Sequence, residues 1–139
     1  MMRRKGREIA LQILYQKDIA DLSIEEAIEN YKRYLNINNI QALKFGEELV
    51  RGVLDNLDFI DKIIQKYTPS WPLERMNITD KNILRLAVYE MFFRPDIPEV
   101  VSINEAVELA KLYGTDDSPA FINGVLDSIF KKEIKSKKL

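Results

Sequence analysis

The segment Thr79–Phe93, TDKNILRLAVYEMFF, decides the fold of this chain. At 100° per residue, its apolar side chains lie around nearly the whole circumference of a helix instead of along one stripe. They are Ile83, Leu84, Leu86, Ala87, Val88, Tyr89, Met91, Phe92 and Phe93. A helix that is apolar on all sides must be surrounded by other helices. We therefore expect this segment at the centre of a helical bundle.

The rest of the chain repeats apolar residues at helical spacing and shows no alternation typical of strands. Four helices are predicted before the central one: residues 4–20, residues 23–36, a third through Phe45, Leu49 and Val53, and a fourth through Ile60 and Ile64 to Tyr67. A turn is expected at residues 36–39, and Pro69 and Pro72 break the chain before the central helix.

Capping signals place the remaining helix ends. Ser23 with Glu26, and Ser102 with Glu105, have the spacing of a capping box, in which a serine and a glutamate three residues on bond each other's backbone amides. A sixth helix is expected to end at Gly114. Ser118 followed by Pro119 predicts the start of a seventh, with the serine as its cap.

Composition limits the class of protein. A chain of 139 residues with 46% hydrophobic residues suits one domain covering residues 1–139. The absence of cysteine and histidine excludes disulfides, the usual zinc sites and histidine-based triads, so we expect no metal and no cofactor. No signal peptide is apparent and no apolar run reaches about 18 residues, which predicts a cytoplasmic protein without membrane contact.

Charge is sorted along the chain. The net charge of −1 combines a basic arm at residues 1–7, a lysine-rich tail at residues 131–139, and an acidic body between them. The arm holds Arg3, Arg4, Lys5 and Arg7 without an acid. Such ends predict binding to a polyanion. The tail is expected to be mainly a solvated end, whereas arginines in the arm suit bidentate pairing with phosphates.

Two aromatic residues depart from the core pattern. Tyr15 lies on the side of the first helix opposite its apolar arc, either covering a neighbouring helix or facing a protein partner. Phe121 lies about 100° from the centre of the apolar stripe of the last helix, on the same side as Lys132. It could staple the loop at residues 114–118, or stack on an unpaired RNA base.

The carboxylates do not suggest an enzyme. Glu105 and Glu108 lie on the polar face of an amphipathic helix, and Asp116 and Asp117 precede a helix N-terminus, where negative charge is favourable. Glu90, on the central helix, is expected to pair with a basic side chain. We therefore expect a protein without catalytic activity.

The order and spacing of several motifs resemble the NusB family of bacterial transcription antitermination factors along nearly the whole chain. The motifs are RRKGRE at residues 3–8, Gln12, LY at 14–15, ILRLA at 83–87, YE at 89–90, IP at 97–98, INEAVELAK at 103–111, Gly114, DS at 117–118, and FINGVLD at 121–127.

The resemblance implies an all-α fold of about seven helices in two small packed bundles. It also implies a non-catalytic factor that binds single-stranded boxA RNA of nascent ribosomal transcripts with the ribosomal protein NusE, within an RNA polymerase antitermination complex. Residues matching the family's RNA-binding positions are Arg3, Arg4, Lys5, Arg7, Asp117 and Phe121, and those matching its NusE-binding positions are Tyr15 and Asp80.

Two residues depart from the family pattern. Gly6 stands where many relatives have alanine. We expect the glycine to destabilise the basic helical turn by up to about 1 kcal/mol, so that this turn frays. Ala120 stands where some relatives carry lysine, which removes one possible phosphate contact.

An alternative interpretation is a helical interaction module that forms a homodimer through the face bearing Tyr15 and binds no specific RNA. Some RNA cytosine methyltransferases carry a domain that resembles NusB, but this chain has no room for their cofactor-binding fold.

Overall fold

The computed structural model describes residues 2–34 and 39–138, and within them the chain forms seven α-helices and no strand. The predicted all-α fold is thus confirmed. The α-helices are α1 (Met2–Ala20), α2 (Ile24–Tyr34), α3 (Ile40–Asp55), α4 (Leu57–Lys66), α5 (Ile78–Phe93), α6 (Glu99–Tyr113) and α7 (Ser118–Ile129). A short 3-10 turn, η1 (Leu73–Arg75), precedes α5, and η2 (Phe130–Ile134) and η3 (Lys135–Lys138) continue α7.

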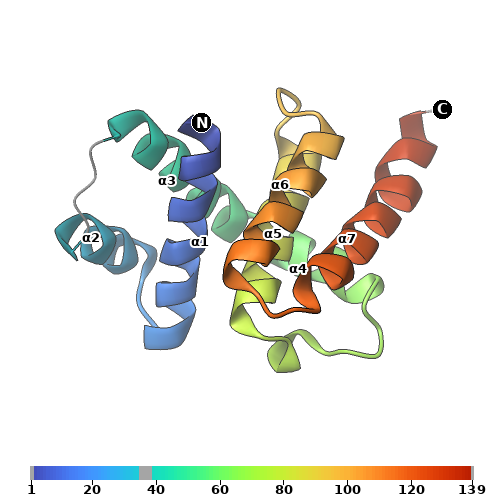
Figure 1. Ribbon diagram of the computed structural model, residues 1–139, viewed down its shortest axis with the longest axis horizontal. Helices are drawn as coiled ribbons and strands as arrows, with labels where there is room; N and C mark the ends of the chain where they lie inside the picture. The colour runs from blue at the N-terminus through green and yellow to red at the C-terminus, as the bar shows by residue number, and fades with distance from the viewer. Residues whose placement is uncertain (1, 35–38, 139) are drawn as a thin grey trace.

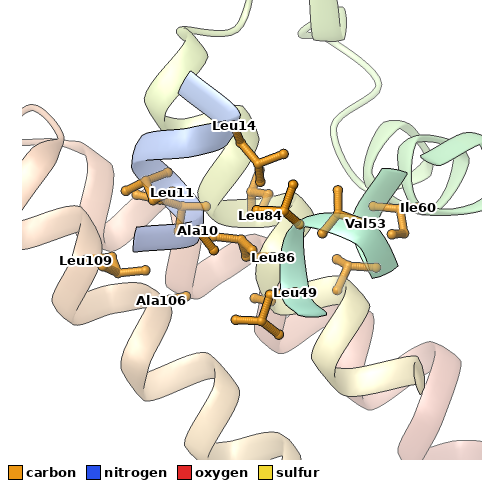
Figure 2. Packing of buried hydrophobic residues seen from close by; sticks show 14 of the residues in the cluster. Ala10, Leu11, Leu14, Leu49, Val53, Ile60, Leu84, Leu86, Ala106 and Leu109 are labelled. Carbon is orange, nitrogen blue, oxygen red and sulfur yellow. The ribbon is translucent and has the colours of Figure 1, made fainter. Parts of the chain in front are cut away.

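The helices form two groups that share one core. Helices α1 to α3 lie on one side and α4 to α7 on the other (Figure 1). Helix α5 contacts α1, α3, α4, α6 and α7, as its apolar circumference predicts. Figure 2 shows Leu84 and Leu86 of α5 among Leu14 of α1, Leu49 of α3 and Leu109 of α6. The C-terminal end of α5 is less enclosed, since Phe93 remains 38% exposed.

The first capping box is confirmed and the second is not. Ser23 Oγ accepts a hydrogen bond from the Glu26 backbone amide, and Glu26 Oε1 accepts one from the Ser23 amide, both at 3.1 Å. Ser102 instead lies inside α6, because Pro98 starts that helix one turn earlier. Its hydroxyl donates to Glu90 Oε1 at 2.8 Å. The prediction of a cap at Ser102 was therefore wrong, because the side chain serves a tertiary contact.

Ser118 also has a different role from the predicted one. It is the first residue of α7, and its Oγ accepts a hydrogen bond from the Thr115 amide at 2.9 Å, so it closes the α6–α7 loop. Asp117 takes the cap position without a side-chain capping bond, and Pro119 lies in the first turn as expected. Helix α6 ends before Gly114, as predicted.

The lysine-rich tail is more structured than a solvated end. Residues 130–138 continue the last helix, and Glu133 and Ile134 are buried. Glu133 accepts hydrogen bonds from Lys66 and Tyr67, which ties the end of the chain to α4. The predicted turn at 36–39 falls mostly outside the described residues; Asn39, at its end, caps α3 by accepting from the Ala42 amide at 3.0 Å.

Helices α1 and α3 cross at two glycines. A Cβ atom on Gly6 would lie 2.6 Å from the Phe45 ring, and one on Gly46 would lie 2.9 Å from the Gly6 carbonyl oxygen and 3.0 Å from Ile9. Gly6 therefore lies in a buried helix crossing. The absence of a side chain there allows the two helices to pack closely, in addition to the helix-propensity cost that the sequence predicts. Gly124 of α7 is the opposite case, with no atom within 4 Å of an added Cβ.

We predict opposite effects for alanine at these two kinds of site. Gly46→Ala should lower the free energy of unfolding by about 1–3 kcal/mol, because its methyl group meets the backbone of α1. Gly124→Ala should raise it by up to about 1 kcal/mol through helix propensity alone. Urea unfolding monitored by circular dichroism measures both, and equal effects at the two sites would contradict the close-crossing explanation.

Candidate nucleic-acid interface

The basic arm forms the first turns of α1, which begins at Met2. The side chains of Arg3, Arg4 and Lys5 are 42%, 58% and 57% exposed. Cations are unfavourable at a helix N-terminus because the free backbone amides there already carry partial positive charge. The first turn of α1 contains no acidic residue to offset them. Cations and free amides together make this end of the helix suited to an anion.

Carboxylates from the second helical group hold the arm in place. Arg3 donates to Asp96 at 2.8 Å, and Arg4 makes a bidentate pair with Glu105 of α6 at 2.6 and 3.0 Å. The hydrogen bond from Arg4 lowers the pKa of Glu105 and raises that of Arg4. Both pairs lie at the surface, so a competing anion can exchange with these carboxylates.

Arg7 differs from the rest of the arm because it is buried. Its side chain is 5% exposed, and its Nε and Nη2 donate to the two oxygens of Glu90 at 2.7 and 2.8 Å. Its Nη1 also reaches Glu105 at 3.5 Å, and Glu90 accepts a further bond from Ser102. The expectation that Glu90 pairs with a basic side chain is confirmed. Arg7 fixes α1 against α5 and α6 and presents no free donor face to solvent.

Arg94, from outside the arm, shares one aromatic ring with two arginines of the arm, which the sequence did not reveal. The guanidinium carbons of Arg3 and Arg94 each lie 5.3 Å from the centre of the Phe45 ring, and that of Arg7 lies at 5.8 Å. Arg94 follows the last residue of α5 and binds Asp96 at 3.0 Å, which lowers the pKa of that carboxyl. In the sequence, the only indication of this role of Arg94 is its position directly after the central helix.

Asp117 and Phe121 lie together at the start of α7. Asp117 is exposed in the loop after α6, and Phe121 is half-buried one turn into the helix. The Phe121 ring packs on Trp71, with ring centres 5.0 Å apart and planes tilted by 49°. The partner of Phe121 is thus a loop that lies fifty residues earlier in the chain. Periodicity could not find Trp71, although it is the only tryptophan of the sequence.

The arm contacts the middle of α6, whereas Phe121 lies on α7, beyond the C-terminal end of α6. Glu105, which binds Arg4, lies eight residues before Tyr113 at the end of α6, or about 12 Å along a helix. A cleft of about 260 Å³ between α1 and α6 is lined by Arg4, Lys111 and Leu112 among others. A ligand that contacts Arg4 and also the C-terminal end of α6 must span about 12 Å. A single-stranded polyanion meets this requirement.

Tyr15 lies in a wide groove on another part of the surface. As predicted, it faces away from the core, and it is 41% exposed. The groove has a volume of about 730 Å³ and lies among α1, α2, the start of α5 and the end of α6. Tyr31 and Tyr113 line it too, so three tyrosines converge there, although only Tyr15 was identified from the sequence.

Asp80 is buried next to Thr79, which lines this groove. Its backbone amide donates to the capping residue Asn77, whose side-chain amide donates to Asp80 Oδ2 at 3.2 Å. Asp80 Oδ1 is buried without a hydrogen-bond partner among the described residues. A buried acceptor of this kind is costly until a donor reaches it.

A family model describing the NusB family matches residues 4–131. The chain belongs to the NusB family. It is 46% identical to the transcription antitermination protein NusB of Thermodesulfovibrio yellowstonii, over 96% of this chain and 95% of that protein. It is 47% identical to the protein of the same name from Myxococcus xanthus, over 91% of this chain and 93% of the relative.

Solved NusB structures have the same fold. T. maritima NusB superposes with a TM-score of 0.86 and 38% identity, over 98% of this chain and 95% of that one. A crystal structure of antitermination factors NusB and NusE in complex with dsRNA gives a TM-score of 0.85 with 28% identity, over 94% and 96% of the two chains. In the described part of this NusB-family chain, no helix is long and apolar enough to cross a membrane.

The buried pair predicts a specific pattern of stability. Arg7→Met should lower the free energy of unfolding by about 3–5 kcal/mol, because it leaves the Glu90 carboxylate buried and uncompensated. The double variant Arg7→Met, Glu90→Leu should regain most of this loss, since no unpaired charge remains. Chemical unfolding of the two single variants and the double variant measures the coupling.

Arg4→Met is the matched control, because Arg4 binds a carboxylate at the surface and should contribute less than about 1 kcal/mol. If the losses of the two single variants simply add in the double variant, Arg7 and Glu90 do not act as a pair.

Proposed function

We propose that this protein is a non-catalytic transcription antitermination factor that binds boxA-type single-stranded RNA of nascent ribosomal transcripts together with NusE. The observation that carries the proposal is the cluster of exposed cations Arg3, Arg4 and Lys5 at the amide end of α1. Like charges are unfavourable at this helix end, and the carboxylates that offset them lie at the surface, where RNA phosphates can replace them. Membership of the NusB family supports the same function.

The RNA-binding residues have different roles in this proposal. Arg3, Arg4 and Lys5 contact phosphates, with RNA oxygens replacing Asp96 and Glu105 as their partners. Arg7 is a positioning residue, since its guanidinium is buried against Glu90. Phe121 offers its exposed face to one unpaired base, and Asp117 accepts hydrogen bonds beside it.

NusE binds in the groove that contains Tyr15. A ribosomal protein is typically basic, and residues 8–130 of this chain carry a net charge of −9, so the two are electrostatically complementary. Tyr15 supplies an exposed aromatic ring, the type of residue that dominates binding energy at interfaces. Asp80 lies beside the lining residue Thr79 at the edge of this interface, where its contacts with Asn77 hold the start of α5. The complex then acts with RNA polymerase in the cytoplasm.

Replacing Arg3, Arg4 and Lys5 with alanine should weaken RNA binding and flatten its salt dependence. Each phosphate contact contributes about 0.7 to the log–log slope for single-stranded RNA, so the slope should fall by up to about 2. Fluorescence anisotropy with a labelled boxA-type oligonucleotide at several salt concentrations measures this, and a scrambled oligonucleotide tests specificity.

The matched control replaces the exposed residues Lys32, Arg33 and Lys62 with alanine, which makes the same change in net charge on other helices. An equal loss of slope in the control would show that net charge, and not the arm, drives binding.

Tyr15→Ala should weaken NusE binding by at least about tenfold and leave the affinity for RNA alone unchanged. Phe59→Ala is the control, because Phe59 is 42% exposed against 41% for Tyr15 but lies on α4 outside the groove. Isothermal titration calorimetry with purified NusE measures both. If Tyr15→Ala leaves NusE binding unchanged but abolishes a homodimer seen by light scattering, the groove serves self-association instead.

A further inference from the structure

Trp71 is an exposed tryptophan on the loop between α4 and η1. It is 41% exposed, although large aromatic residues of this kind are usually well buried. One part of its ring packs on Phe121 of α7, and the remainder faces solvent. The two rings come from distant parts of the chain, and together they form an aromatic surface larger than Phe121 alone provides.

Side-chain hydrogen bonds from Gln65 and Thr68 to the backbone hold the loop that carries Trp71 in place. The side-chain amide of Gln65 donates to the carbonyl oxygens of Thr68 and Trp71 at 2.9 and 3.1 Å, and its oxygen accepts from the Leu73 amide at 3.0 Å. Thr68 Oγ1 donates back to Ile64 at 3.0 Å. These bonds order the loop without using the indole ring. The ring is thus presented to solvent in a fixed place, which reduces the entropy lost on binding.

Cations lie along the same strip of surface. The ammonium groups of Lys66 and Lys132 lie 5.7 and 5.9 Å from the centre of the Tyr67 ring. Because Tyr67 lies near Lys132 and Trp71 lies against Phe121, residues 67–71 run beside the last helix in the opposite direction. Eleven residues separate Phe121 from Lys132, which is roughly 16 Å along a helix.

This strip of surface has the rings of Phe121 and Trp71 at one end. At the other end, Lys66 and Lys132 lie around the Tyr67 ring. Rings beside cations are the combination that binds unpaired nucleotides, because bases stack on the rings and phosphates lie near the positive charges. Lys66 and Tyr67 both donate to Glu133, which fixes the position of the Tyr67 ring at this end of the strip.

We propose that Trp71 is a second base-stacking residue, and that single-stranded RNA continues past Phe121 over Trp71 toward Tyr67 and Lys132. This inference rests on the proposed function, because it extends the RNA path from Phe121. It adds at least one nucleotide to the bound length, in a region that the arm on α1 does not contact.

The intrinsic fluorescence of Trp71 tests the proposal directly, because no other tryptophan is present. Titration of the full chain with boxA-type single-stranded oligonucleotides of increasing length should quench this fluorescence once the oligonucleotide reaches the strip. The control is the double variant Trp71→Phe, Phe59→Trp, which moves the reporter to α4 and should show no quenching.

Affinity gives an independent measure. Trp71→Ala should weaken RNA binding by about 5- to 50-fold with an unchanged salt slope, since stacking removes no counterion. Trp71→Phe should retain much of the affinity, because it keeps an aromatic face. Thermal unfolding of both variants checks that the fold is intact.

The outcomes separate the two proposals. If RNA binds with an arm-dependent salt slope while Trp71 fluorescence is unchanged and Trp71→Ala binds normally, the stacking inference is overturned and the proposed function stands. If the unaltered protein binds no RNA even with NusE, the proposed function fails as well. Quenching by NusE alone, without RNA, would assign the strip to a protein contact and overturn the inference.

Discussion

The ion pair between Arg7 and Glu90 is the contact on which the arrangement of the two helical groups depends. It joins the first helix to the central one inside the protein, where removing two charges from water costs several kcal/mol. The bidentate geometry and the further bonds from Ser102 and to Glu105 offset that cost. A hydrocarbon contact could slide, but this one fixes both the rotation and the position of α1. The fixed position determines where the remaining residues of the arm emerge.

The same end of α1 shows a compromise between stability and binding. Four cations in its first turns oppose the helix dipole, and each of the three exposed ones is near a carboxylate. The depressed pKa of Glu105 shows that its pairing with Arg4 favours the charged state of both groups. This stabilisation is present above the ordinary pKa of a glutamate, near 4.5, and is lost as the pH falls through the lowered value in the folded protein. At neutral pH the arm is ordered before any ligand arrives.

Local sequence signals were reliable where the local chain alone decides the structure. The capping box at Ser23 and the end of α6 at Gly114 were correctly predicted, because neighbouring residues satisfy these helix ends. The same serine and glutamate pattern at Ser102 failed, because a buried acceptor on another helix bound the hydroxyl. The tail was expected to be solvated, yet Ile134 packs against the core. In these two failures a contact distant in sequence outweighed a local preference, whereas at Ser118 the hydroxyl bonded the nearby Thr115 amide in place of capping α7.

The sequence by itself determined the helical class, the central place of α5, the outward direction of Tyr15 and the presence of a basic arm. These properties follow from periodicity and charge, which depend only on residue order. The tertiary structure alone decided that Arg7 is buried while Arg3 and Arg4 are exposed, and that Trp71 lies on Phe121. Helical periodicity gives the direction of a side chain around its own axis and says nothing about which distant chain segment packs there.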